Sequence, residues 1–164
     1  KASDWLELID DSGWGQAMHN PDIRAGHPNR RAWRAAEIPG GNGMGDARAL
    51  ATLYGALAKG GALGSACLLS ADGVAAATAE RYRGPDASFG SDTAFGAGFR
   101  LAGEGGEMGP SAAAFGHSGW GGTQAFADPD AGIGFAFVTQ RMLGFDDGID
   151  PRRARLIDAL YGAL

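Results

Sequence analysis

The sequence has a single cysteine, Cys67, and only two lysines among its 164 residues. One cysteine excludes an internal disulfide and any metal site built from cysteines alone. Its apolar neighbours predict a buried, unreactive thiol. No apolar run reaches the ~18 residues that a membrane-spanning helix requires, and the first residues do not form a charged and apolar leader. We therefore expect a cytoplasmic protein without a membrane span.

Basic charge is also scarce. The 14 Lys and Arg residues are outnumbered by 19 Asp and Glu residues, which gives a net charge of −5. No basic face is visible, and this argues against a nucleic-acid partner. The three histidines do not follow a zinc-ligand spacing, so we expect neither a metal nor a cofactor. Glycine is abundant, at 29 residues, but without the repeating period of collagen.

The length predicts one domain over residues 1–164. Residues 1–43 contain clustered turn residues without a sustained hydrophobic period, and we expect an irregular connection there. Residues 44–164 predict helices, then antiparallel strands, then a closing helix. This order is typical of an α+β protein, in which an antiparallel sheet is flanked by helices.

Three helices are predicted in the second part. Asp46 is the expected N-cap of the first. The second begins after Ser70 and continues to about Tyr82, where Gly84-Pro85 ends it. The third begins at Asp150, which is followed by proline at the first helical position.

Three strands are predicted as well. Apolar residues alternate with glycine and arginine over residues 95–100, which is a strand period. Residues 122–127 and 132–140 predict two further strands, and the turn residues Asp128-Pro129-Asp130 between them predict a hairpin.

Residues 115–123, F-G-H-S-G-W-G-G-T, are the densest candidate for chemistry. Their small residues allow a backbone or ligand to approach closely. A nucleophile elbow, G-x-S-x-G, requires glycine where Trp120 stands and a histidine after the serine. A phosphate loop requires G-K-[ST], which the sequence lacks. We therefore interpret the segment as the edge strand of an acyl-transfer site.

The triplet His117-Ser118-Gly119 resembles the K-T-G or H-[ST]-G triplet of penicillin-recognising serine hydrolases. The glycines and apolar strand that follow it, together with Ala36-Glu37-Ile38-Pro39, Asn42-Gly43 and the helix after Asp46, are similar to family VIII carboxylesterases, the class C β-lactamase-like esterases. The resemblance covers about residues 30–164. It implies part of a β-lactamase/transpeptidase-like fold.

The resemblance also implies roles in the site. His117 and Ser118 would orient the substrate or the proton network, and the backbone N–H of Trp120 would donate to the oxyanion. Three glycines would keep that backbone accessible to substrate: Gly119, Gly121 and Gly122. The structural alternative is that the triplet is only a tight turn at the start of a strand, and the Trp120 ring fits a core as well as a pocket wall.

The motifs of the nucleophile are missing. In this superfamily the nucleophile is the serine of S-x-x-K, and the tyrosine of Y-x-N handles a second proton. The residue three before Lys59 is Ala56, and none of the three tyrosines has asparagine two positions later. We therefore expect the C-terminal portion of a longer serine hydrolase, inactive alone, that acts on a small ester or β-lactam through an acyl-serine intermediate. Its unmatched sheet edge would bind the N-terminal portion or a second copy.

Two alternatives stay open. One is a non-catalytic binding module that keeps the glycine-rich strand without the nucleophile. The other is a true β-lactamase or D-alanyl-D-alanine peptidase instead of an esterase. His117 in place of lysine favours the esterase, because the positive charge that would meet a substrate carboxylate is missing at neutral pH.

Overall fold

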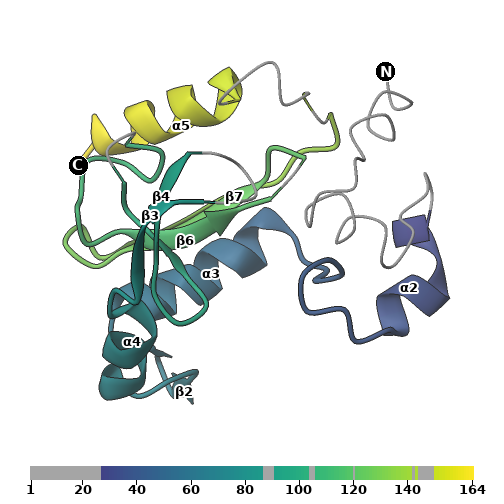
Figure 1. Cartoon of the computed structure of the whole chain (residues 1–164), viewed down its shortest axis with the longest axis horizontal. Coiled ribbons are helices and arrows are strands. Elements are labelled where there is room, and N and C mark those ends of the chain that lie inside the picture. Colours follow the sequence, from purple (N-terminus) through teal and green to yellow (C-terminus); the bar gives the residue numbers. More distant parts are fainter. Residues whose placement is uncertain (1–26, 87–90, 104–105, 120, 142, 144–149) are drawn as a thin grey trace. The chain divides into compact units, whose positions relative to one another are not determined.

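The computed structural model describes residues 27–86, 91–103, 106–119, 121–141, 143 and 150–164 (Figure 1). The chain divides into two units, Lys1–Gly45 with Ala87–Gly90, and Asp46–Asp86 with Ser91–Leu164. In the first unit, the described residues form η2 (His27–Asn29) and α2 (Arg31–Ala35) where an irregular connection was predicted. The Asn42 amide donates to the Trp33 carbonyl at 2.9 Å, and this bond fixes the chain after α2.

The second unit is built on a six-stranded antiparallel sheet in the order β3-β4-β5-β6-β7-β8. Its strands are β3 (Tyr82–Pro85), β4 (Asp92–Phe95), β5 (Arg100–Leu101), β6 (Phe115–Ser118), β7 (Gln124–Asp128) and β8 (Ile133–Phe137). Successive strands are neighbours, so the sheet is a meander. A separate hairpin pairs β1 (Ala62–Leu63) with β2 (Ala66–Cys67).

The described residues of this unit form three helices: α3 (Ala47–Ala58), α4 (Ala71–Thr78) and α5 (Pro151–Tyr161). Each begins where the sequence predicts. Side-chain oxygens of Asp46, Ser70 and Asp150 accept backbone N–H groups in the first turns of their helices, at 2.8, 3.0 and 2.9 Å respectively. The cap predictions for Asp46 and Asp150 and the helix start predicted after Ser70 are confirmed, since a cap depends only on residues close in sequence.

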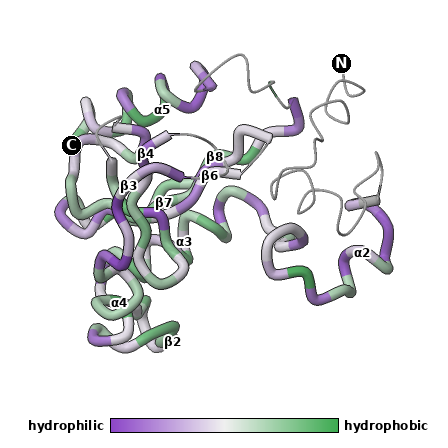
Figure 2. The backbone as a smooth tube through the Cα atoms, viewed as in Figure 1, coloured by the Kyte–Doolittle hydropathy of each residue, from purple (hydrophilic) through white to green (hydrophobic). Residues whose placement is uncertain are grey.

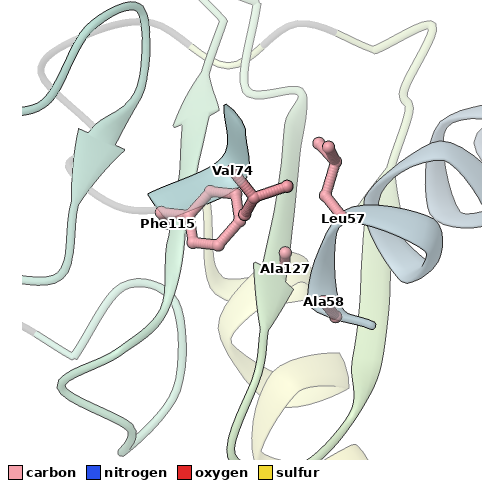
Figure 3. Close-up of a cluster of buried hydrophobic side chains, with 5 residues drawn as sticks. All are labelled: Leu57, Ala58, Val74, Phe115 and Ala127. Carbon is pink, nitrogen blue, oxygen red and sulfur yellow. The ribbon is translucent and has the colours of Figure 1, made fainter. Parts of the chain in front are cut away.

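Helices α3 and α5 cover opposite faces of the sheet (Figure 1). Ala127 of β7 packs with Leu57 of α3 in one buried cluster, drawn in Figure 3. Its neighbour Phe126 packs with Ile157 of α5 in a second cluster. Because successive strand residues point to opposite faces, the two helices must lie on different sides. The result is the predicted α+β architecture, in which the sheet lies between two helical layers. Figure 2 shows hydrophobic stretches mixed with hydrophilic ones along the strands.

Two of the predicted elements are wrong. The strand expected over residues 95–100 is interrupted, because β4 ends at Phe95 and a turn follows in which the Gly96 N–H donates to the Phe99 carbonyl at 2.9 Å. The helix expected to reach Tyr82 ends at Thr78, and Tyr82–Pro85 form β3. Proline is tolerated there because β3 is an edge strand.

The thiol of Cys67 is exposed, so the prediction of a buried cysteine is also wrong. Its strand β2 has two residues, and both are exposed. So short a hairpin buries little apolar surface of its own. The predicted hairpin after residue 127 is confirmed, since β7 and β8 pair from Asp128 opposite Ile133 onwards.

Candidate active site

The triplet lies at the end of β6, where pairing in the sheet becomes one-sided. Strand β7 pairs with all four β6 residues, up to Ser118 opposite Gln124. Strand β5 pairs only with Phe115 and Gly116. In the register of the described strands, His117 therefore has a strand partner on one side alone, as does Ser118. The segment predicted as an edge strand is thus an inner strand whose last two residues form an open edge.

His117 and Ser118 lie on opposite faces of the sheet, as successive strand residues do. Ser118 shares its face with Gln124, on the side of α5. His117 shares its face with Phe115, on the side of α3. A ligand on either face would therefore meet only one of the two side chains. A ligand placed against the open edge can reach both.

The imidazole of His117 is exposed and held by the backbone of the next residue. Its Nδ1 lies 2.7 Å from the Ser118 carbonyl oxygen. A carbonyl oxygen only accepts, so Nδ1 carries the hydrogen in this contact. The ring also lies beside Phe95, with 6.2 Å between centroids. The His117 ring at the open edge is thus oriented through its Nδ1 atom.

A tight loop joins β6 to β7 and contains the three glycines predicted to contact substrate. The Gly119 N–H donates to the Thr123 carbonyl at 2.7 Å, and the Gly122 N–H donates to the Gly119 carbonyl at 3.0 Å. A Cβ on Gly119 would collide with the Thr123 hydroxyl, and Gly122 has φ +89°. Gly121 is buried. The structure of the loop therefore explains why glycine is needed at two of these three positions. Trp120 lies outside the described residues.

Asp150, which sequence reasoning used only as a helix cap, lies beside this loop at Gly122, and Arg152 binds its carboxylate. The Asp150 carboxylate is 3 % exposed and accepts from the Arg152 backbone and from its guanidinium, with 2.5 Å to Nη2. The hydrogen bonds and charge of Arg152 hold the pKa of Asp150 at about 2, against the desolvation of the buried carboxyl. The only local signal for this ion pair is an arginine two residues after the cap.

A cavity of about 260 Å³ lies elsewhere in the unit, between β4, β5 and residues 106–109. Arg100 and Glu107 form an ion pair of 3.0 Å in its wall. No residue from 115 to 123 lines it, so it is separate from the open edge. No three His, Cys, Asp or Glu side chains in the described part of the chain are grouped to hold a metal. None of the described helices is long and apolar enough to cross a membrane.

Comparison with known proteins identifies the class. The Beta-lactamase family model matches residues 8–159, so the chain belongs to the Beta-lactamase family. It is 35% identical over 133 residues to the Esterase/beta-lactamase LipL of Mycobacterium tuberculosis (strain ATCC 25618 / H37Rv). That match covers 80% of this chain and 30% of LipL.

Solved structures give the same answer for the fold. A family VIII carboxylesterase is 44% identical with a TM-score of 0.81, over 90% of this chain and 40% of its own. A penicillin-binding protein homologue from Caulobacter crescentus is 42% identical with a TM-score of 0.78, over 97% of this chain and 40% of its own. The resemblance to β-lactamase-like esterases is thus confirmed. The chain spans well under half the length of each of these relatives.

Proposed function

We propose that this chain forms one wall of the acyl-transfer site of a serine hydrolase, most closely an esterase, that works through an acyl-serine intermediate. The observation that carries the proposal is the open edge at His117 and Ser118, where β6 extends past β5. Unpaired backbone groups at a strand edge can hydrogen-bond an extended substrate. Family membership and the esterases among the relatives support the reaction class.

In this proposal each residue of the segment has a separate role. The Nε2 atom of His117 accepts a hydrogen bond from the substrate or from the proton network on the α3 side. The Ser118 hydroxyl orients the substrate from the α5 side. The Trp120 N–H donates to the oxyanion, and such a donor contributes on the order of 10²–10³ to turnover. Gly119, Gly121 and Gly122 keep that stretch of backbone free of side chains.

The nucleophile comes from residues outside this sequence, which contains neither S-x-x-K nor Y-x-N. The relatives provide room for it, because the chain matches only 30% of LipL and 40% of the carboxylesterase. We propose that the N-terminal portion of the same protein supplies it and pairs with β8, whose outer side has no partner among the described strands. A second copy of the chain is the other partner we expect. As expected from the sequence, we also propose that the protein is cytoplasmic and does not bind nucleic acid.

An ester is favoured over a β-lactam because histidine, and not lysine, stands at the first position of the triplet. The Nδ1 atom of His117 is engaged with the Ser118 carbonyl, and histidine lacks the permanent ammonium group that would meet a substrate carboxylate. A neutral ester does not need that cation, whereas lysine at this position would provide it. A His117→Lys variant should therefore shift preference towards carboxylate-bearing substrates.

A chimera tests the proposal. The matching 40% of the family VIII carboxylesterase is replaced by this chain, and hydrolysis of a p-nitrophenyl short-chain ester is measured with and without a fluorophosphonate. We expect turnover that the fluorophosphonate abolishes, and a loss of kcat/KM of at least tenfold in Ser118→Ala. The control is Ser111→Ala, which removes a hydroxyl bound to Asp130 at 2.7 Å, before β6 begins.

Two results would overturn the proposal. A chimera that folds like its parent but lacks turnover would favour the non-catalytic binding module. Turnover by this chain alone, inhibited by the fluorophosphonate, would place a nucleophile within these residues and contradict the division of the site between two portions of a chain.

A further inference from the structure

The β6–β7 loop lies directly against the first turn of α5. A Cβ built on Gly122 would lie 3.3 Å from Oδ2 of Asp150 and 4.0 Å from Cγ2 of Thr139. Gly122 also has φ +89°, a conformation that favours glycine. The loop backbone at Gly122 therefore faces a buried carboxylate, with little room for a side chain between them.

That carboxylate is fixed from the other side by Arg152. The guanidinium donates to Asp150 through Nε at 2.9 Å and through Nη2 at 2.5 Å. Nη2 also donates to the Arg141 carbonyl at 2.8 Å, and the group lies over the Phe137 ring, 5.6 Å from its centroid. Arg152 thus joins the start of α5 to β8 and to the segment after it. The carboxylate that faces the loop is therefore held in place by Arg152.

Helix capping alone does not account for this arrangement. Asp46 caps α3 from an exposed position, with a single backbone hydrogen bond of 2.8 Å from Ala49. Asp150 does the same task for α5 but is buried and ion-paired. A buried carboxylate is costly unless its charge is compensated. The extra structure around Asp150 is in contact with one other element of the site, the loop at Gly122.

We propose that Asp150 and Arg152 are positioning residues that hold Gly119 and residues 121–123 in the conformation required for oxyanion binding. They touch no reacting atom. Their effect passes through Gly122 to the two backbone hydrogen bonds that join Gly119 to Thr123 and Gly122 to Gly119. The last step, from loop conformation to turnover, rests on the proposed function, whereas the contact between Asp150 and the loop does not.

Amide hydrogen exchange in the full chain tests the contact. Asp150→Asn keeps a side chain that can cap α5 but removes the charge that Arg152 binds. We expect the exchange of the Gly119 and Gly122 amides to accelerate at least tenfold, while the amide of Phe126 in the buried strand β7 is unchanged. Asp46→Asn is the matched control and should leave all three amides as they were.

Arg152→Gln provides a second variant at a partly exposed position, so that folding is retained if Asp150→Asn unfolds the chain. It should accelerate exchange of the same two amides. Unchanged exchange at Gly119 and Gly122 in a folded variant of either residue would overturn the inference.

The catalytic consequence is measured in the ester-hydrolysing chimera. Asp150→Asn should lower kcat by ~10- to 100-fold with little change in KM, because small displacements of catalytic groups have effects of this size. Asp46→Asn should leave kcat unchanged. Faster loop exchange with undiminished kcat would refute the catalytic role and keep the contact. If the variants exchange faster but the unsubstituted chimera has no turnover, only the proposed function would be refuted.

Discussion

The hydroxyl of Tyr161 donates a 2.6 Å hydrogen bond to Oδ2 of Asp128, which ties the last turn of α5 to the β7–β8 hairpin. Asp128 is 1 % exposed. Its other oxygen accepts the backbone N–H groups of Asp130 at 2.9 Å and Ala131 at 3.2 Å. Burial, followed by the bond to the Asp128 carboxylate, raises the pKa of Tyr161. The buried carboxylate is therefore fully partnered by its own turn and by the closing helix.

Tyr161→Phe should destabilise the chain by ~1–3 kcal/mol, because it leaves Oδ2 of Asp128 buried without its donor. The ring that packs against Gly109 is kept. The matched control is Tyr82→Phe, which removes an exposed hydroxyl bound to the Pro85 carbonyl at 2.7 Å and should cost less than ~0.5 kcal/mol. Urea unfolding compares the two. Equal losses of unfolding free energy in the two variants would show that the buried hydrogen bond contributes no more than the exposed one.

Two glycines at the contact of α3 with β8 should respond to alanine with opposite signs. A Cβ on Gly134 would collide with the backbone of Gly55 and Ala51, so Gly134→Ala should destabilise by at least ~1–3 kcal/mol. A Cβ on Gly55 would lie 3.8 Å from the Gly134 nitrogen, an ordinary contact. Gly55→Ala should stabilise by up to ~1 kcal/mol through helix propensity. Thermal unfolding measures the stability change of each variant. Changes of the same sign in both would contradict the packing described.

The low pKa of Asp150 predicts a specific loss of stability in acid. Arg152 lowers this pKa from 3.8 to about 2 in the folded state. The contribution to stability is therefore complete above pH 3.8 and is lost as the pH falls through about 2, because the unfolded chain binds its proton first. The difference in unfolding free energy between wild type and Asp150→Asn should narrow over that range. A difference that stays constant from pH 5 to pH 2 would exclude the linkage.

The two edges of the sheet should differ in their tendency to associate. The outer strand β3 carries Arg83 and Pro85, features that discourage further pairing. The other outer strand, β8, has the sequence I-G-F-A-F without charge or proline. We expect this chain alone to self-associate through β8, and Val138→Lys, just after that strand, to reduce the association. A monodisperse wild-type monomer in light scattering would contradict this prediction.

Features that depend on nearby residues were predictable from the sequence. The helix starts at Asp46, Ser70 and Asp150 and the hairpin after Asp128 are local hydrogen-bonded patterns, and the structure confirms each. Strand β3 was missed because its pairing with β4, and not its own sequence, makes it a strand. The turn within residues 95–100 was missed as well, because the alternating pattern does not show where strand pairing stops.

The candidate site divides in the same way. The motif predicted an edge strand over residues 115–123, and the structure has the inner strand β6 at Phe115–Ser118. The open edge at His117 depends on where β5 stops, which lies far away in the sequence. The contact of Gly122 with Asp150 depends on the packing of α5 and has no local signal. The roles of the six predicted site residues stay predictions.

The alternation of faces along β6 makes the order of the triplet matter as much as its composition. Exchanging His117 and Ser118 would keep both functional groups but deliver the imidazole to the α5 layer and the hydroxyl to the α3 layer. Inserting one residue into the strand would have the same effect, and inserting two would restore the original sides. The side of the sheet on which each group lies therefore depends on whether its position along β6 is odd or even.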